Sequence, residues 1–303
     1  MLTSSGTARA FEVVRPGPLA TLQDTGRRGV AALGVPRAGA LDEPAYRWAN
    51  ALVGNAPGAA AVEATLGGLA LRAVGGGAWV AVTGAPAPVR VGGRPAAWGA
   101  PVRVAAGESV EIGPPSAGVR CYLAVDGGFA VPPVLGSRSA DLLAGLGPTP
   151  LAPGTRLPLG PAGSLGPLGP GAADCVPLPA PPVELLLRLT PGPRRDWFEA
   201  GSLAALGRAR YLVSPATNRV GLRLTDGPPL VRRPGLGELP SEGMVLGAVQ
   251  VPPDGMPVVF LADHPTTGGY PVIGVVPGTD LASAAQALPG TPVRFLPTSR
   301  LDA

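Results

Sequence analysis

Short apolar runs of strand length, separated by Gly- and Pro-rich turns, fill most of the chain. Between about residues 60 and 130 the clearest runs are 78–84, 88–93, 101–113 and 119–129. Gly92-Gly93 and Asp126-Gly127 are dipeptides typical of hairpin turns. Residues 11–22 predict a further strand, which a Pro-Gly-Pro turn interrupts. This pattern indicates a turn-rich β protein.

Two segments have helical periodicity instead. In residues 43–53 the apolar residues recur at helical spacing, and they are Ala45, Trp48, Ala49 and Leu52. Asp42 supplies an N-cap, and Gly54 is a favourable residue just past the end. A second helix is expected within residues 197–207.

The second half repeats the strand pattern after a break in composition. Residues 145–182 are rich in Pro, Gly and Leu with few charges, which is typical of an extended connection. Strand-like runs resume in 183–193, 218–230, 244–276 and 293–296. We therefore expect a mainly β protein with an N-terminal β-rich domain at 1–180 and a second domain at 181–303.

Composition restricts the chemistry. Gly and Pro, at 46 and 40 residues, make up more than a quarter of the chain, while charged residues are only 15%. All 24 basic residues are Arg, so the chain offers no Schiff-base lysine, no phosphate-binding Walker lysine and no biotin-accepting lysine. A net charge of +4 and 4% aromatic residues argue against a nucleic-acid binder. A single histidine excludes a poly-His metal site, and we expect no bound metal.

The cysteines and the lengths of the apolar runs indicate the cellular compartment of the protein. Cys121 and Cys175 are the only cysteines, and their spacing suits neither a disulfide scaffold nor zinc. The N-terminus lacks the charged and apolar regions of a signal peptide, and no run of 18 apolar residues occurs. These features predict a soluble, cytoplasmic protein.

Side-chain amides are scarce in a chain skewed towards Ala, Gly, Pro, Arg and Val. The six are Gln23, Asn50, Asn55, Asn218, Gln250 and Gln286. If the skew reflects a GC-rich coding sequence, a retained amide has an increased chance of serving a function. This hypothesis points to residues 22–63 and 241–271.

The segment 23–29 combines an amide, a carboxylate and two guanidinium groups. Gln23, Asp24, Arg27 and Arg28 suit the binding of carboxylates or phosphates. The alternative is a loop held together by its own Asp–Arg pair. Farther on, Glu63 lies among apolar residues and needs a partner, for which Arg27, Arg28 or Arg37 is the natural choice.

Three other polar segments have both a functional and a structural interpretation. Asn55 follows Gly54 and suits a left-handed turn residue. Ser137, Arg138 and Ser139 could bind an anion, or the serines could cap a helix-like segment at 139–146, which the local pattern favours. Ser241 and Glu242 begin a strand-like run in which Gln250 needs a hydrogen-bond partner.

The loop 262–271 is the sharpest single feature. Asp263 next to His264 would suit a tuned base, while the two threonines and two glycines suit an oxyanion or a phosphate. Neighbouring side chains on an extended chain point to opposite faces, however, so the Asp and the His need not meet. A purely structural loop is the alternative.

Together these motifs resemble a known family. The segments that carry the resemblance are 21–29, 34–55, 62–68, 135–139, 218–224, 241–255 and 263–271. In this order they are similar to the allophanate-hydrolase-subunit-2 family, also called KipA-like, C-type 5-oxoprolinase or biotin-dependent carboxyltransferase. The resemblance covers about residues 11–297. One departure is His264-Pro265, where the family commonly has Arg-Gln, which disfavours His264 as a general base.

The resemblance implies a fold, partners and an activity. The fold is a cyclophilin-like β-barrel in the C-terminal domain. The expected partner is a KipI-like protein, the B-type component of 5-oxoprolinase. Together with this partner and a third subunit, the chain would cleave 5-oxoproline to L-glutamate in an ATP-dependent reaction. The complex as a whole would bind the ATP. One alternative is carboxyltransfer in a urea or amide carboxylase, with biotin carried on another protein. The other is a non-catalytic, KipA-like antagonist of a KipI-like kinase inhibitor.

The same resemblance defines the candidate site. Arg27, Arg28 and Arg138 would hold a carboxylate or phosphate, with Asp24 and Glu63 orienting them. The expected catalytic residues are Asp24, Arg27 and Glu63. The expected binding residues are Gln23, Arg28, Asp42, Asn50, Asn55, Ser137, Arg138, Asn218, Arg219, Ser241, Glu242, Gln250, Asp263, His264, Thr266, Thr267, Gly268, Gly269 and Tyr270.

Overall fold

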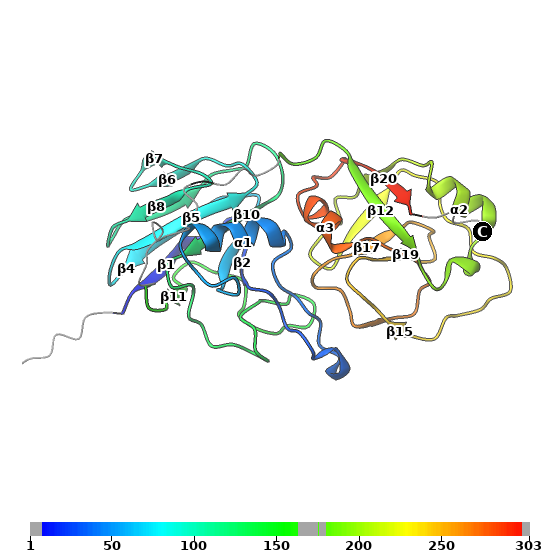
Figure 1. Cartoon of the computed structure of the whole chain (residues 1–303), viewed down its shortest axis with the longest axis horizontal. Helices are drawn as coiled ribbons and strands as arrows, with labels where there is room; N and C mark the ends of the chain where they lie inside the picture. The colour runs from blue at the N-terminus through cyan, green and yellow to red at the C-terminus, as the bar shows by residue number, and fades with distance from the viewer. Residues whose placement is uncertain (1–7, 163–174, 176–179, 299–303) are drawn as a thin grey trace, which may run out of the picture. The chain divides into compact units, whose positions relative to one another are not determined.

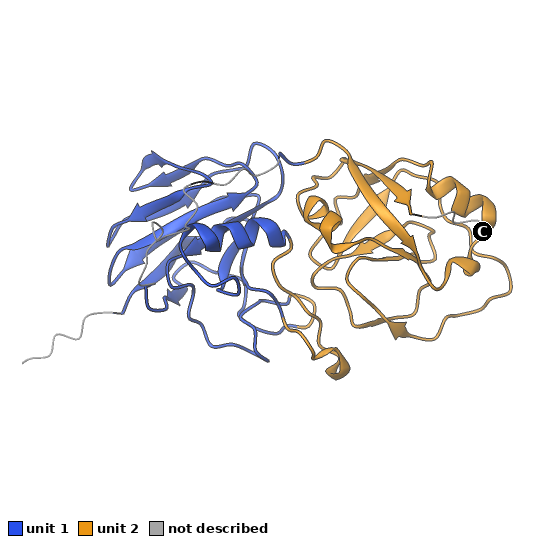
Figure 2. Ribbon diagram, viewed as in Figure 1, with its two compact units in different colours: residues 1–26, 42–141, 145–181 blue, residues 27–41, 142–144, 182–303 orange. Residues whose placement is uncertain are grey.

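The computed structural model describes residues 8–162, 175 and 180–298. The chain divides into two compact units, coloured separately in Figure 2. Unit 1 contains residues 1–26, 42–141 and 145–181, and unit 2 contains residues 27–41, 142–144 and 182–303. Each unit has its own buried apolar cluster.

Unit 1 is built from two antiparallel sheets (Figure 1). The six-stranded sheet has the order β11 (Arg156–Pro158), β1 (Ala10–Arg15), β4 (Leu69–Val74), β9 (Ser109–Ile112), β6 (Val89–Val91) and β7 (Arg94–Ala96). The five-stranded sheet has the order β2 (Leu19–Gln23), β3 (Ala61–Thr65), β10 (Arg120–Val125), β5 (Ala78–Gly84) and β8 (Pro101–Val104). Apolar side chains from both sheets form one cluster, so the two sheets pack face to face as a sandwich.

The other face of the five-stranded sheet is covered by a helix. Helix α1 (Glu43–Leu52) packs against β5 and β10. Asp42 caps its first turn, because the side-chain Oδ1 accepts a hydrogen bond from Ala45 N at 3.1 Å. Strand β10 is therefore buried along its whole length, with the sandwich core on one side and α1 on the other.

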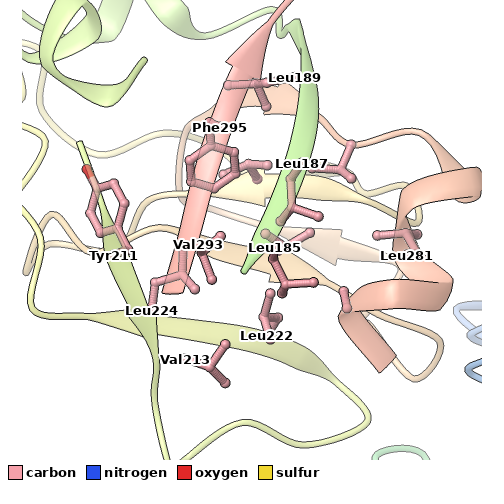
Figure 3. Close-up of a cluster of buried hydrophobic side chains, with 14 of the residues drawn as sticks. Leu185, Leu187, Leu189, Tyr211, Val213, Leu222, Leu224, Leu281, Val293 and Phe295 are labelled. Atoms are coloured by element: carbon pink, nitrogen blue, oxygen red, sulfur yellow. The ribbon is translucent and has the colours of Figure 1, made fainter. Parts of the chain in front are cut away.

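Unit 2 is a closed seven-stranded barrel. Its strand order is β12 (Leu185–Pro191), β19 (Val272–Val275), β16 (Ala248–Gln250), β17 (Val258–Phe260), β14 (Gly221–Thr225), β13 (Tyr211–Val213) and β20 (Pro292–Pro297). The parallel pair β12–β20 closes the ring, and the other pairs are antiparallel. Alternate side chains such as Leu187, Leu222 and Phe295 fill the interior (Figure 3). This confirms a mainly β fold with a C-terminal barrel.

Three helical segments and a small ribbon accompany the barrel. They are the 3₁₀ turn η2 (Arg195–Trp197), α2 (Ala200–Leu206) and α3 (Gly278–Ala285), while β15 (Glu242–Gly243) and β18 (Thr267–Gly268) form a two-stranded ribbon. Unit 2 also includes a short 3₁₀ turn, η1 (Ala31–Leu33). On α3, the Asp280 carboxylate binds the Arg188 guanidinium of β12 and accepts a hydrogen bond from Arg188 N at 2.9 Å.

Most predicted strands lie where the pattern placed them. The run 78–84 is β5, and Gly92-Gly93 forms the β6–β7 turn with φ values of 56° and 76°, as a hairpin turn of this type requires. The predicted helix at 43–53 matches α1. Helical spacing places Trp48 on its apolar face, but the Trp48 side chain is 41% exposed. The extended connection proposed for 145–182 includes β11, and its residues 163–174 and 176–179 lie outside the described residues.

The helix-like interpretation of residues 139–146 is wrong. The segment forms turns, with Asp141 N donating to Leu146 O at 2.9 Å across an isolated bridge. Gly145 adopts a left-handed backbone with φ of 65°, which a continuing helix does not allow. The serines at 137 and 139 therefore cap no helix.

Candidate functional site

A buried polar row crosses four strands of unit 1 beneath α1. In the sheet register, Thr21 on β2 is opposite Glu63 on β3, Glu63 is opposite Tyr122 on β10, and Tyr122 is opposite Thr83 on β5. All four side chains are buried. Thr83 Oγ1 donates to Ala45 O of α1 at 2.7 Å, so the row also fastens the helix to the sheet.

Tyr122 is the central residue of this row. Its hydroxyl donates to Glu63 Oε2 at 2.8 Å and accepts from Asp42 N at 2.8 Å. Burial, reinforced by the charges of Glu63 and Asp42, raises the pKa of Tyr122 well above its ordinary value. The phenol therefore stays protonated and acts as a fixed hydrogen-bond donor. On the other side of Glu63, Arg120 Nε lies 3.6 Å from Oε1.

The Asp24 carboxylate accepts four hydrogen bonds. Its Oδ1 accepts from Ser137 Oγ and Ser139 Oγ, each at 2.6 Å, and from Gly26 N at 2.8 Å. Its Oδ2 accepts from Arg138 N at 2.6 Å. Four donors on one buried carboxylate fix the 137–139 loop against the end of β2.

The serines thus serve Asp24, and Arg138 is left to face outward from the loop. Its Nε donates to Val131 O at 2.6 Å, which orients the guanidinium group while the side chain stays half-exposed. Gln23 is fully buried, and its Nε2 donates to Thr21 Oγ1 and Ala140 O. Gln23 Oε1 is buried without a hydrogen-bond partner among the described residues.

Two of the scarce amides form a structural pair. Asn55 Nδ2 donates to Asn50 Oδ1 and to Val125 O, both at 2.8 Å, and Asn55 Oδ1 accepts from Gly127 N. Asn50 Nδ2 donates to Ala59 O at 3.0 Å. These bonds satisfy the ends of α1 and β10, which accounts for the two amides without a ligand.

The segment 27–41 contributes two of the predicted residues in unit 2. Arg27 is only 2% exposed, and its N–H donates to Arg37 O at 2.7 Å, whereas the Arg28 side chain is exposed. The segment is held to the barrel by Ala38 N, which donates to Ala262 O at 3.1 Å. This bond explains why the segment belongs to unit 2 although it precedes residue 180 in the sequence.

Arg219 and Asp263 form a buried ion pair in unit 2. Arg219 Nε lies 3.0 Å from Asp263 Oδ2, and Nη2 lies 2.9 Å from Oδ1, with both side chains at most 3% exposed. Arg219 Nη2 also donates to Gly39 O at 2.7 Å. Asn218, next in the chain, accepts from Val220 N and orders the approach to β14. The pair thus anchors the 27–41 segment.

His264 occupies a different environment from Asp263. Its ring stacks on Phe260 with centroids 5.8 Å apart and an interplanar angle of 14°. Its Nδ1 lies 2.8 Å from Pro265 O, and since a carbonyl only accepts, Nδ1 carries the proton in this contact. The two residues therefore point into separate surroundings.

The remaining predicted residues gather around the β15–β18 ribbon. Glu242 is opposite Gly268 in the ribbon and forms an ion pair with Arg194 that lowers the pKa of the Glu242 carboxyl. Gln250 Nε2 donates to Tyr270 O at 3.2 Å. A Cβ on Gly268 would lie only 2.7 Å from Gln250 Nε2, so a side chain at this position would displace the Gln250 amide. The other predicted members of this group are Ser241, Thr266, Thr267 and Gly269, of which Ser241 and Thr267 are exposed.

Several side chains that contact predicted residues were not predicted, and four of them carry a hydroxyl or a guanidinium group of particular interest. They are Tyr122, Arg120, Arg194 and Arg232. Tyr122 lies in a run predicted as a strand, and a polar residue at a position buried on both faces is the signal that could have indicated it. No local sequence pattern distinguishes the three arginines from the other arginines of the chain.

Neither a metal-binding cluster nor a membrane-spanning helix is found among the described residues. No group of three or more His, Cys, Asp or Glu side chains in that part of the chain could hold a metal ion. None of its helices is long and apolar enough to cross a membrane.

The fold and the polar clusters define a class: a β-sandwich unit with a buried polar row, and a seven-stranded barrel with a Gly-rich polar loop. A model of one family, the carboxyltransferase domain, subdomain A and B, matches residues 33–297. The chain therefore belongs to this carboxyltransferase domain family.

Individual relatives agree with this assignment. The chain is 37% identical to the C-type 5-oxoprolinase component of Escherichia coli, over 97% of this chain and 93% of that protein. It is 33% identical to urea amidolyase of Lachancea kluyveri, over 96% of this chain but only 17% of that protein. The solved structure of TTHA0988 matches 97% of this chain with a TM-score of 0.84 and 36% identity, and the chain spans 57% of that protein's length.

Proposed function

We propose that this chain is the C-type component of an ATP-dependent 5-oxoprolinase. It cleaves the cyclic amide of 5-oxoproline to L-glutamate together with a KipI-like, B-type component and a third subunit. The observation that carries the proposal is its 37% identity to the C-type 5-oxoprolinase component of Escherichia coli over nearly the whole of both chains.

The chemistry explains the need for ATP and for partners. Opening this unstrained lactam is uphill without nucleotide, so phosphorylation of the amide oxygen is the expected activation. The chain has no lysine and hence no Walker-type phosphate lysine, which favours nucleotide binding at the level of the complex. Consumption of ATP and two free thiols favour a cytoplasmic location.

The geometry supports a division of labour among the predicted residues. The exposed Arg28 and the half-buried Arg138 are each proposed to hold a carboxylate or phosphate, with Arg27 as a third candidate. Asp24 positions Arg138 through the 137–139 loop, and Glu63 is proposed to act within the polar row through the protonated Tyr122. The Thr266–Tyr270 segment offers hydroxyl and backbone donors.

Co-expression with the two partner subunits, followed by an assay of 5-oxoproline-dependent ATP hydrolysis, tests the proposal. The wild-type complex should hydrolyse ATP only when 5-oxoproline is present. Arg138→Ala should reduce this activity at least about tenfold, corresponding to about 1.4 kcal/mol. Arg47→Ala, which removes an exposed arginine paired with Glu43 on α1, is the matched control and should leave the activity unchanged. A well-formed complex without substrate-dependent hydrolysis would exclude the proposal.

Carboxyltransfer is the second candidate. It is favoured by the family model and by the 33% identity to urea amidolyase over 96% of this chain. The biotin would reside on another protein, because this chain has no lysine to carry it. Transfer of labelled carboxylate from carboxybiotin to an amide by the purified complex, without 5-oxoproline-dependent ATP hydrolysis, would favour this candidate over the first.

A further inference from the structure

Arg232 is an arginine whose guanidinium group has no acidic partner within 4 Å among the described residues. Its backbone is held by an antiparallel bridge to Phe198, with Arg233 N donating to Trp197 O at 2.8 Å. Its Nη2 donates to Val251 O at 2.8 Å. Its Nε is buried and has no hydrogen-bond acceptor among the described residues. A charged donor left in this state needs an acceptor from elsewhere.

The surroundings of Arg232 are arranged around the Gly-rich loop. Its Cζ lies over the Tyr270 ring, 5.8 Å from the centroid, and the ring is 44% exposed. Tyr270 O accepts from Gln250 Nε2, and Pro271 O accepts from Val251 N at 3.1 Å. The arginine, the tyrosine and the end of β16 are therefore connected by hydrogen bonds and stacking.

Arg194 provides the contrast. It lies beside β19, since its N–H donates to Val272 O at 3.2 Å, but its guanidinium group binds the Glu242 carboxylate through two nitrogens. One arginine of this region thus has its carboxylate within the chain, whereas Arg232 has none among the residues that the structure describes. The difference points to a ligand rather than to a structural ion pair.

We propose that Arg232 and Tyr270 form a binding subsite for the carboxylate of a small molecule. The carboxylate accepts hydrogen bonds from Nε and from the second proton of Nη2, which lie side by side on one edge of the guanidinium group. Rotation of the half-exposed Tyr270 ring opens Nε, and the ring then packs on the flat face of the ligand. The identity of the ligand rests on the proposed function: it is the substrate, 5-oxoproline, which has a carboxylate on the carbon next to its ring amide.

The test compares 5-oxoproline with 2-pyrrolidinone, the same lactam without the carboxylate. Binding of both compounds to the complex is measured by ligand-detected NMR without ATP, and the KM for 5-oxoproline is measured with ATP. Arg232→Gln should weaken 5-oxoproline binding about 10- to 100-fold and raise its KM similarly, while 2-pyrrolidinone binding stays within about twofold. Arg233→Gln, the same change on the adjacent and exposed arginine, should alter neither.

The outcomes separate the subsite from the proposed function. Equal 5-oxoproline affinities for Arg232→Gln and Arg233→Gln in an active complex overturn the subsite. If Arg232→Gln does not fold, Arg232→Lys is used instead. Lysine keeps the positive charge but lacks the paired N–H donors of the guanidinium group, so wild-type affinity of this variant for 5-oxoproline also overturns the subsite. Propionate, a simple carboxylate, separates the two proposals. If the complex shows no 5-oxoproline-dependent ATP hydrolysis but Arg232→Gln still weakens the binding of propionate, the subsite is supported and the proposed function is excluded.

Discussion

Replacing Asp24 with Asn should loosen the 137–139 loop, because the wild-type carboxylate accepts from four donors at 2.6–2.8 Å. In one orientation of the amide, Nδ2 faces Arg138 N, so two donors meet where a charge-assisted bond existed. In the other, Nδ2 faces Gly26 N and the two serine hydroxyls. Losing one charge-assisted bond and leaving a buried donor unmatched costs about 2–4 kcal/mol.

Hydrogen exchange at the Arg138 amide reports this change directly. Its N–H is donated to Asp24 Oδ2, so a loss of about 2–4 kcal/mol should speed exchange about 30- to 1000-fold. Global stability is followed by urea unfolding. A Trp197→Phe background leaves the remaining tryptophans, Trp48, Trp79 and Trp98, all in unit 1, so fluorescence reports that unit alone.

The matched control is Asp254→Asn, which makes the same chemical change at an exposed site. Asp254 Oδ1 accepts only from Met256 N among the described hydrogen bonds, so its replacement should cost about 0.5 kcal/mol or less. A change in the free energy of unfolding of less than about 0.5 kcal/mol counts as no effect. If Asp24→Asn stays within this limit and leaves hydrogen exchange at the Arg138 amide unchanged, the carboxylate does not hold the loop and the reasoning is refuted.

Three more predictions concern stability and thiol reactivity. The pKa of Asp280 is lowered by its hydrogen bonds to the arginine of β12, so its stabilisation is present above the unfolded value of about 3.9 and is lost as the pH falls through the folded value. Asp280→Asn should therefore cost about 1 kcal/mol at pH 7 and progressively less as the pH falls below about 3.9, measured by urea unfolding across this range; a constant difference would contradict this. Gly247→Ala should destabilise at least about 2 kcal/mol more than Gly290→Ala in thermal unfolding. Both glycines have φ above 80°, but a Cβ would lie 2.1 Å from a backbone oxygen only at the first. Burial raises the pKa of Cys121 to about 12, so native protein should react with a thiol reagent at Cys175 alone and at both cysteines in denaturant; rapid native labelling of both would show the first to be accessible.

Much of the local structure follows from the sequence. Alternating and continuous apolar runs predicted β5 at its observed bounds, and the Gly-Gly turn predicted the β6–β7 hairpin, because burial periodicity and positive φ are local properties. The N-cap Asp42 was likewise readable from the residues around it. The family resemblance came from short motifs in a fixed order, and the family match and a relative spanning nearly the whole chain confirm it.

The partnerships between side chains were decided only by the tertiary structure. Asp24 meets Ser137 across 113 positions of sequence, and this contact removes the serine from the helix cap that the local pattern favoured. Tyr122 and Glu63 meet because strand register places β10 beside β3. Arg232 combines an unmatched Nε with a position beside the Tyr270 ring, and both depend on the groups packed around it. Apolar periodicity reports which face of an element is buried, whereas hydrogen-bond partners depend on register and loop closure between distant segments, and these have no local signature.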